Sequence, residues 1–434
     1  MKILIISHNP LCTYNAMGKT LASMFSCFRK DELCQLYIYP SYPDLDLCSS
    51  YFRITDKDVL RSLACFSRPG NEIDKGRISS GIKPFESKRD EQFYRSAKNK
   101  SSVRRIARDT MWRVSRWYGR ELRTWLEQEH PDLIFAAPGI ACFLYDLAIE
   151  ISKRRGIPIV SYICDEYFFV KQGRTLAERF QQRLLKNKIE TFLKSAAFLF
   201  TISEELKSAY EAYFSIPAAV LMTGSTITAS SDSAAEQQAD TISYFGNIRS
   251  GRYVSLRQIG DALDSYNSVC AQKHYLDVYS FEHDPDILKY LGKPASVRIH
   301  DFIQGKEFEE VFLSSKLLAH VESFDEAQID RVKHSVSTKI ADSLASGIPL
   351  FAYGPAGLSS IKHLRRNACA FVCTDPAQLS ETLQYAMNDL AARKSIVQRA
   401  RETAALFHDS ASNSRMLYRK LLQICGDEHE SRPS

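Results

Sequence analysis

Short apolar runs separated by longer polar stretches recur along the first half of the chain. Each run has six to eight residues and is bounded by turn residues. Such runs are typical of strands buried on both faces of a parallel sheet. We therefore predict strands at residues 2–7, 34–40, 132–138, 157–163, 196–203 and 218–224.

The stretches between these runs are long enough for helices. One of them, YDLAIEISKRR, has helical spacing and closes at Gly156-Ile157-Pro158, with the glycine expected where a helix stops. Strands that alternate with helices predict an open parallel sheet with right-handed crossovers. The first half of the chain therefore has the pattern of a doubly wound α/β domain.

The composition changes between Ser225 and Asp240, where the chain is polar, rich in small residues and without periodicity, as in a linker or exposed loop. The alternation then resumes, which predicts a second doubly wound, Rossmann-like domain. Such sheets bind ligands beyond the carboxyl ends of their strands, so we expect the two domains to face each other across a cleft. The predicted boundaries are 1–224 for the first domain, 225–240 for the linker, 241–410 for the second domain and 411–434 for a C-terminal helix and disordered tail. The strands of the second domain are predicted at residues 241–247, 275–280, 296–303, 316–323, 348–354 and 368–374.

The segment HNPLCTYNAMGKTL, residues 8–21, ends in Gly18-Lys19-Thr20, the letters that close a phosphate-binding P-loop. A P-loop needs a second glycine five residues earlier, because its backbone N–H groups must fold around the phosphates. That position holds Thr13, which argues against a nucleoside triphosphatase. A strand followed by a glycine-bearing loop and a helix is still suited to binding a phosphate.

Residues 335–357, SVSTKIADSLASGIPLFAYGPAG, carry the most informative local pattern. Ser337 and Thr338 are good N-cap residues, and Gly347 followed by Pro349 would end the helix before the next strand. A helix N-terminus with a hydroxyl and Lys339 in one turn is suited to a diphosphate, and Asp342 one turn on is suited to a ribose diol. The alternative is an ordinary capped helix that packs on a strand.

Composition narrows the class of protein. A chain of 434 residues with 44% apolar and 25% charged residues fits a globular protein of two or three domains. Its eleven cysteines are scattered without a C-x-x-C pair, which predicts reduced thiols and no zinc site. No apolar run reaches the roughly 18 residues of a spanning helix, and the first apolar segment is too short for a signal peptide. We therefore expect a cytoplasmic protein.

The positive charge is concentrated in one segment. Residues 84–123 carry twelve Lys or Arg against five acids, a local excess that is larger than the net charge of +6 of the whole chain. A basic helical stretch with aromatics is typical of contact with an anionic membrane surface; the alternative is a solvated helix face with its aromatics in the core. No recognisable nucleic-acid module is present, so no nucleic-acid partner is expected. The aromatic residues of the segment are Phe93, Tyr94, Trp112, Trp117 and Tyr118.

The stretch STKIADSLASGIPLFAYGPAG resembles the donor-site segment of the retaining GT-B glycosyltransferases of family four, and most closely the branch that builds bacterial capsular and exopolysaccharides. The tandem layout, ISYFGNIRSGR in the second half and the N-terminal ISHNP...NAMGKTL extend the resemblance over most of the chain. It is specific near residues 335–357 and diffuse in the first 220 residues. It implies a transferase with a nucleotide-sugar donor and no cofactor or metal.

The resemblance implies roles for several residues that would hold the donor. Gly18, Gly246 and Asn247 lie where backbone approaches the donor phosphates in the family, and a glycine there leaves room for the ligand. Arg252 and Lys339 would balance the diphosphate leaving group, whose charge grows as the glycosidic bond breaks.

Other donor contacts are implied nearer the sugar and the base. Asp342 matches the family's glutamate on the ribose hydroxyls, and Ile303 lies where backbone groups read the nucleobase. His334 stands where the common motif has a second acid on the donor sugar, so the identity of the sugar cannot be transferred from relatives. Glu322, after its predicted strand, is either a further polar group in the same cleft or a structural residue.

Acids in the first domain are candidates for the acceptor side. Asp165 and Glu166 follow a predicted strand directly, where they are placed to orient an acceptor hydroxyl or to stabilise an oxocarbenium charge. His8 is an alternative, or else a loop residue satisfied by backbone.

The sequence therefore predicts a metal-independent, retaining glycosyltransferase that acts on a lipid-linked or polysaccharide acceptor. Retention rests on the resemblance alone. Two alternatives stay open: a nucleotide-sugar epimerase on the same fold, and a non-catalytic nucleotide-sugar-binding subunit, which the altered pair of His334 and Asp342 suggests.

Overall fold

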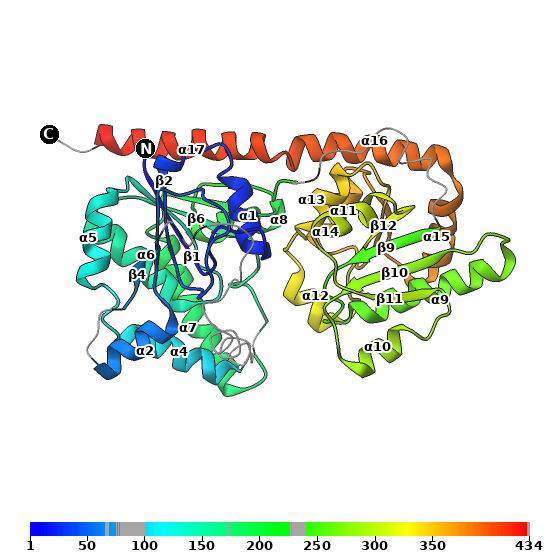
Figure 1. The fold of residues 1–434 in the computed structure, drawn as a ribbon, viewed down its shortest axis with the longest axis horizontal. Helices are drawn as coiled ribbons and strands as arrows, with labels where there is room; N and C mark the ends of the chain where they lie inside the picture. The colour runs from blue at the N-terminus through cyan, green and yellow to red at the C-terminus, as the bar shows by residue number, and fades with distance from the viewer. Residues whose placement is uncertain are drawn as a thin grey trace. The chain divides into compact units, whose positions relative to one another are not determined.

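The computed structural model describes residues 1–65, 69–74, 76, 78, 101–171, 173–225, 227 and 240–431. The chain divides into two compact units (Figure 1). Unit 1 combines Met1–Thr223 with the C-terminal helix α17 (Ser410–Ser431), and unit 2 is Gly224–Asp409.

Unit 1 is built on a sheet of eight strands in the order β4-β3-β2-β1-β5-β6-β7-β8. All neighbouring strands are parallel except the edge pair β3 and β4. The central strands are wholly buried, as their continuous apolar runs predict. The strands are β1 (Ile3–Ser7), β2 (Leu33–Tyr37), β3 (Ser50–Arg53), β4 (Asn71–Glu72), β5 (Leu133–Ala137), β6 (Ile159–Ile163), β7 (Phe198–Thr201) and β8 (Ala218–Val220).

Helices connect and cover these strands (Figure 1). Helix α6 ends at Gly156, whose φ of 65° is the left-handed C-cap that the sequence predicts. Helix α17 packs against α1, so the end of the chain returns to the first unit. The helices of unit 1 are α1 (Ala16–Met24), α2 (Asp56–Cys65), α4 (Ser102–Val114), α5 (Arg120–Glu129), α6 (Cys142–Arg155), α7 (Leu176–Leu193), α8 (Glu204–Phe214), α17 and the short 3-10 helix η1 (Lys30–Glu32).

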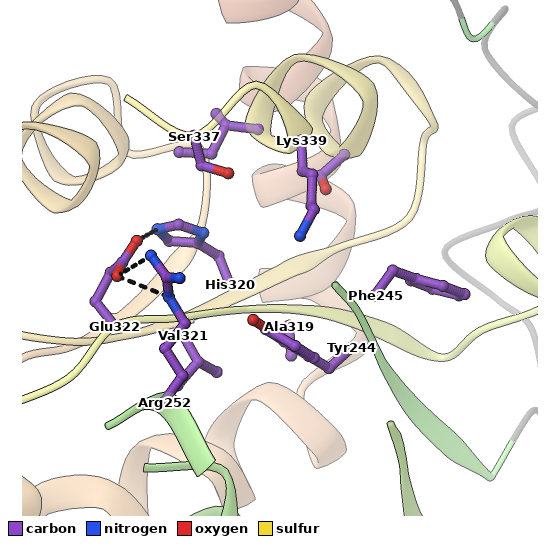
Figure 2. Close-up of a pocket in the computed structure, with 11 residues that line it drawn as sticks. Tyr244, Phe245, Arg252, Ala319, His320, Val321, Glu322, Ser337 and Lys339 are labelled. Atoms are coloured by element: carbon purple, nitrogen blue, oxygen red, sulfur yellow. Dashed lines mark hydrogen bonds and ion pairs between the residues drawn. The ribbon is translucent and has the colours of Figure 1, made fainter. Parts of the chain in front are cut away.

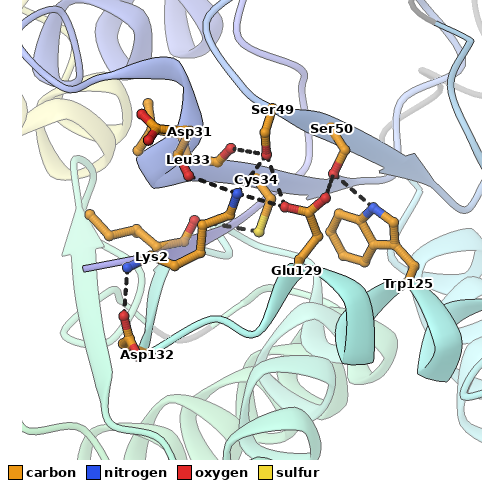
Figure 3. Close-up of polar contacts among 10 residues, drawn as sticks. Lys2, Asp31, Leu33, Cys34, Ser49, Ser50, Trp125, Glu129 and Asp132 are labelled. Carbon is orange, nitrogen blue, oxygen red and sulfur yellow. Dashed lines mark hydrogen bonds and ion pairs between the residues drawn. The ribbon is translucent and has the colours of Figure 1, made fainter.

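A polar cluster fixes the N-terminal end of β1 (Figure 3). Lys2 Nζ lies 2.7 Å from Glu129 Oε2, and Glu129 Oε1 accepts a hydrogen bond of 2.6 Å from Ser50 Oγ. Trp125 Nε1 donates to the same hydroxyl at 2.9 Å. Burial opposes the charge on Glu129, but Lys2 and the serine hydroxyls outweigh it and lower the pKa of Glu129. The cluster joins three strands to α5 at the edge of the sheet away from the carboxyl ends.

Unit 2 has a six-stranded sheet in the order β11-β10-β9-β12-β13-β14, and all its pairs are parallel. Its strands are β9 (Thr241–Phe245), β10 (Tyr275–Ser280), β11 (Val297–Asp301), β12 (Leu317–Val321), β13 (Leu350–Tyr353) and β14 (Phe371–Cys373). Its helices are α9 (Arg252–Val269), α10 (Pro285–Leu291), α11 (Gly305–Leu313), α12 (Glu326–Val332), α13 (Lys339–Ala345), α14 (Ser359–Arg366), η4 (Pro376–Gln378), α15 (Leu379–Asn388) and α16 (Leu390–Phe407).

The prediction of an α/β fold with two doubly wound, parallel-sheet domains is confirmed. All twelve predicted strands are present. Eleven of them lie within the predicted run, and β2 begins one residue before its run. The pattern missed β3 and β4, because their sequences, SYFR and NE, are not apolar runs. Of the predicted linker, only Ser225, Ile227 and Asp240 lie among the described residues.

The basic segment 84–123 is only partly described, and residues 84–100, with Phe93 and Tyr94, lie outside the described residues. Within α4, Trp112 is fully buried, donates from Nε1 to Asp56 Oδ1 at 2.7 Å and stacks on Phe143. Arg108 Nε lies 2.9 Å from the same carboxylate. Trp112 therefore belongs to the interior of unit 1, and the half-buried Arg108 is paired with Asp56. Trp117 and Tyr118, which follow α4, are half-buried. No described helix is long and apolar enough to cross a bilayer.

Candidate functional site

A pocket opens in unit 2 beyond the carboxyl end of β9. The chain runs from β9 outward through β10 and β11 and then returns to β12 on the other side of β9, so the crevice between β9 and β12 is the topological switch point of the sheet. Ligands of open α/β sheets bind at this kind of crevice. The pocket is lined by Tyr244, Phe245, Arg252, Ala319, His320, Val321, Glu322, Ser337, Lys339, Ile340 and Ser343 (Figure 2).

Gly246 directly follows β9 at the wall of this pocket. Its φ is +135°, a conformation that residues with a side chain rarely adopt, and a Cβ built there would overlap Lys339 Nζ. Its N–H donates to the carbonyl of Tyr279 at 2.9 Å. Glycine is therefore required here by backbone conformation and by the lysine that lies over it.

An ion pair occupies the floor of the pocket. Arg252, the first residue of α9, donates from Nε and Nη2 to Glu322 Oε2 at 3.0 and 2.7 Å (Figure 2). Glu322 is buried just after β12, and this burial raises its pKa, while Arg252 opposes the rise. The predicted cation and the predicted acid are thus partners of each other, and Glu322 holds the guanidinium at the pocket.

His320 completes this group, and the sequence reasoning missed it. Its Nε2 lies 3.7 Å from Glu322 Oε1 and, among the described residues, has no hydrogen-bond partner. Burial, Arg252 and Lys339 lower the pKa of His320 to about 3, so the ring is neutral. The period-two alternation of HVES places His320 and Glu322 on one face of the strand, and that signal could have identified the histidine.

Lys339 reaches into the pocket from the start of α13, with its Nζ 5.7 Å from the ring centroid of Tyr244. Burial of the ammonium and the neighbouring Arg252 lower the pKa of Lys339 to about 8, while Glu322 opposes the shift. The residue as a whole is exposed, so a ligand has access to it. Two cations against one carboxylate give the pocket a positive balance, which suits a phosphate or diphosphate.

Anion binding in this pocket should weaken as the pH rises through 8. A lysine with a pKa of about 8 loses its proton between pH 7 and pH 9, whereas a terminal phosphate, with a second pKa of about 6, is already ionised over that range. Affinity for a nucleoside diphosphate, measured by calorimetry, should fall up to about tenfold by pH 9. Lys339→Arg keeps its charge at both pH values, so its profile should be flat. A parent profile as flat as that of the arginine variant would contradict this role.

Helix α13 covers Lys339–Ala345 of the predicted helical residues 339–346, but its N-terminus differs from the prediction. Thr338 itself has helical φ and ψ of −60° and −22° and makes no side-chain cap. Ser337 does line the pocket. Asp342 is buried and accepts a hydrogen bond of 3.0 Å from Ser225 Oγ, so its carboxylate holds the segment that enters unit 2. A role of Asp342 toward a ribose stays a prediction.

Three further predicted donor residues lie outside the lining of the pocket. Asn247 is exposed, and its Oδ1 accepts from the N–H of Arg249 at 2.8 Å. His334 is half-buried between α12 and α13. Ile303 follows β11, next to Phe302, whose ring stacks on that of Phe281 at 3.7 Å between centroids.

The pair of Phe281 and Phe302 is a feature that the sequence reasoning missed. The two residues follow the adjacent strands β10 and β11, and the Phe281 side chain is 69% exposed. A flat aromatic surface at the carboxyl edge of the sheet is suited to stacking against a planar base. The register of two parallel strands, which only the structure supplies, brings the rings together.

The predicted residues of unit 1 have other partners. Asp165 follows β6 and accepts from the Tyr167 hydroxyl at 3.1 Å. Glu166 is buried, and its Oε1 accepts from the N–H groups of Phe168 and Phe169 at 2.7 and 2.8 Å. The Glu166 carboxylate therefore closes the turn after β6 inside an aromatic cluster, which differs from the expectation that it faces a cleft.

His8 follows β1 and is neither a free base nor satisfied by backbone alone. Its Nε2 lies 3.2 Å from Arg108 Nη2, and Arg108 is held by Asp56. Burial and Arg108 lower the pKa of His8 to about 4, so the ring is neutral and Nε2 accepts from the guanidinium. A catalytic role for His8 or Asp165 stays a prediction.

Gly18 has a packing reason to be glycine. Its N–H donates to Asn15 Oδ1 at 2.7 Å, and an added Cβ would lie 2.6 Å from the Pro10 carbonyl oxygen and overlap Cys12 Sγ. The loop after β1 thus folds directly over the first turn of α1. The proposed approach of a diphosphate to Gly18 stays a prediction, with this contact as a sufficient alternative.

Gly18→Ala should destabilise unit 1 through this contact. Overpacking costs roughly 1–3 kcal/mol, which corresponds to about 2–4 °C in Tm for each kcal/mol. Gly426→Ala on α17, where an added Cβ meets nothing within 4 Å, is the matched control and should leave Tm unchanged or raise it. An unchanged Tm of Gly18→Ala, measured by calorimetry, would show that the loop yields and that packing does not explain this glycine.

No group of three or more His, Cys, Asp or Glu side chains in the described part of the chain is placed to hold a metal ion. The ten cysteines with described side chains form no disulfide.

A comparison with known protein families matches the part of the chain that forms most of the pocket. Residues 269–418 match the family described as Glycosyl transferase-like. This stretch contains His320, Glu322 and Lys339, while Arg252 precedes it. No curated protein sequence is significantly similar to this chain.

Solved structures match over nearly the whole chain. A sucrose-phosphate synthase (tll1590) from Thermosynechococcus elongatus has a TM-score of 0.63 and 10% identity and covers 97% of this chain and 99% of its own. Alr3699/HepE of Anabaena, in complex with UDP, has a TM-score of 0.61 and 13% identity over 98% and 100% of the two chains. An α,α-trehalose 6-phosphate synthase from Burkholderia multivorans has a TM-score of 0.60 and 9% identity over 100% and 98%. At these identities the similarity shows the fold, which is the GT-B fold.

Proposed function

We propose that this protein is a glycosyltransferase that takes a sugar from a nucleotide-sugar donor. The observation that carries the proposal is the pocket at the switch point of unit 2, where Arg252 and Lys339 converge beside Gly246. Two cations at this position are suited to a diphosphate, whose negative charge grows as the bond to the sugar breaks. Arg252 and Lys339 would then supply the charge that a metal provides in other transferases.

The comparisons support a nucleoside diphosphate as the donor's leaving group. The structure of Alr3699/HepE contains UDP, and a second structure of the same protein contains UDP-glucose. The match of residues 269–418 to a glycosyl transferase-like family covers most of the described pocket residues. The residues of 335–357 add the resemblance to retaining enzymes of surface polysaccharide synthesis.

The proposal also includes the acceptor and the stereochemistry of the transfer. We propose a lipid-linked or polysaccharide acceptor, transfer with retention, and action at the inner face of the plasma membrane. Asp165 is the candidate for orienting the acceptor hydroxyl, because it is only half-buried at the carboxyl end of β6. The Glu166 carboxylate instead accepts a hydrogen bond from the backbone of its own turn.

A panel of UDP-, GDP-, ADP- and dTDP-sugars tests the proposal. Slow release of a nucleoside diphosphate from one of them supports a transferase. Conversion of the sugar to its C2 epimer, detected by NMR, would instead indicate an epimerase, and binding without turnover would indicate a non-catalytic subunit. If neither a nucleotide sugar nor a nucleoside diphosphate raises Tm or binds in calorimetry, the pocket is not a donor site.

A further inference from the structure

Helix α7 of unit 1 presents two large apolar side chains to solvent. Leu176 is 82% exposed and Phe180 is 58% exposed. The two residues are four positions apart in the first turns of the helix, so they lie on one face, one above the other. Side chains of this size rarely remain so exposed in neighbouring positions without a partner surface.

Positive charge surrounds these two side chains. Arg174, Arg179 and Arg183 are exposed, and the latter two occupy the same helix face as Leu176 and Phe180. No acidic side chain pairs with Arg179 or Arg183 among the residues that the structure describes. The one acid of the first turn, Glu178, accepts hydrogen bonds from the N–H groups of residues 174 and 175.

The start of α7 is held rigidly, so the face is preformed. Thr175 and Glu178 form a capping box, in which each side chain accepts from the other's N–H group. The preceding loop is fastened to the helix, because Gly173 N–H donates to Gln182 Oε1 at 2.7 Å and Arg179 Nε donates to the Gly173 carbonyl at 3.0 Å. Presentation of Leu176 and Phe180 therefore costs little ordering when a partner binds.

The opposite side of α7 belongs to the core of unit 1. It is marked by buried residues at helical spacing, and α7 packs against α4 and α6. The exposed face cannot turn inward without unpacking that side. The buried residues are Gln181, Leu185, Ile189, Phe192 and Leu193.

We infer that this face of α7, formed by Leu176, Arg179, Phe180 and Arg183 and flanked by Arg174, docks on an anionic lipid bilayer. Leu176 and Phe180 would enter the boundary between headgroups and acyl chains, while the arginines stay at the level of the lipid phosphates. An apolar centre with exposed arginines at its margin is complementary to a bilayer, which offers apolar chains beneath anionic groups. A nucleic acid would use the charge and leave the two apolar side chains in water.

This surface is distinct from the basic segment considered from the sequence, whose described aromatic Trp112 lies in the core. The inference does not rest on the donor chemistry of unit 2, and the two can fail separately. The inference names the exposed face of α7 as the surface by which the protein contacts a membrane.

Sedimentation of the full-length protein with vesicles of phosphatidylglycerol and phosphatidylcholine tests the inference. Leu176→Ser combined with Phe180→Ser should weaken binding roughly tenfold or more. Arg179→Gln combined with Arg183→Gln should also weaken it roughly tenfold, and added salt should reduce the difference. Leu406→Ser in unit 2, at a residue that is 70% exposed, is the matched control and should bind as the parent does.

Each variant should keep the nucleoside diphosphate affinity of the parent, because the altered side chains of α7 lie in unit 1 and Leu406 lies outside the pocket lining. Tm should change little, because the altered side chains are exposed and the arginine variant loses one exposed hydrogen bond, from Arg179 to the Gly173 carbonyl. Equal sedimentation with pure phosphatidylcholine would overturn the inference, as would unchanged binding of the Leu176 and Phe180 variant. A loss confined to the arginine variant would mean unspecific adsorption by charge, and would overturn it too. Loss of vesicle binding in the control to the same degree would assign the effect to general surface hydrophobicity.

Discussion

Arg252→Met is expected to lower the free energy of unfolding of unit 2 by roughly 3 kcal/mol, because it leaves the Glu322 carboxylate buried without its cation. Glu322 is 5% exposed, and among the described residues the hydrogen bonds to its carboxylate come from Arg252. Urea unfolding, followed by fluorescence and circular dichroism, measures the change. The same variant should bind a nucleoside diphosphate at least tenfold more weakly than the parent.

A second substitution separates the two effects of Arg252. Arg252→Met combined with Glu322→Gln removes the unpaired charge, so stability should return to near the parent value while diphosphate affinity remains low. Arg249→Met is the matched control: Arg249 pairs with buried Glu282 in the same unit, but Glu282 also accepts from the N–H groups of His283 and Asp284 at 3.0 Å. Its loss of stability should be smaller. If the double variant bound the diphosphate like the parent, Arg252 would be structural only.

Lys339→Ala is expected to weaken binding of both the nucleoside diphosphate and the intact nucleotide sugar by about 10- to 100-fold. The substitution removes a charge-assisted hydrogen bond worth roughly 1.5–3 kcal/mol, at the cation that lies over Gly246. Affinity for the nucleoside without phosphates should not change. Calorimetry with the three ligands makes the comparison directly.

Lys333→Ala is the control for Lys339, since Lys333 is also an exposed lysine and lies six residues earlier, outside the pocket lining. Lys339 is exposed and makes no ion pair among the described residues, so Lys339→Ala should leave Tm almost unchanged, in contrast to Arg252→Met. Equal affinity of Lys339→Ala and the parent for the diphosphate would refute the proposed donor site.

The sequence alone determined the architecture of this protein. A buried parallel strand must be apolar on both faces, and this requirement is local. Each strand from β5 to β14 can therefore be recognised as an apolar run in the sequence. Helix ends are equally local, as Gly156 shows, because the left-handed C-cap depends on one residue. The same locality placed Lys339 at the beginning of a helix and Gly246 at the end of a strand, while the resemblance supplied Arg252. Lys339 and Arg252 line the pocket, and Gly246 lies beside Lys339.

The tertiary structure decided how side chains pair across elements. Glu322 and Arg252 are 70 residues apart, and no local pattern shows that a buried carboxylate holds the arginine or that His320 lies beside them. The stack of Phe281 on Phe302 depends on the register of β10 with β11. Gly18 and Glu166, which the sequence predicts to face a ligand, also have partners in a packed loop and a tight turn, and their roles toward a ligand stay predictions. Secondary structure follows from the spacing of residues along the chain. The interaction partners of a side chain depend on which elements the fold brings together, and the local sequence does not show this.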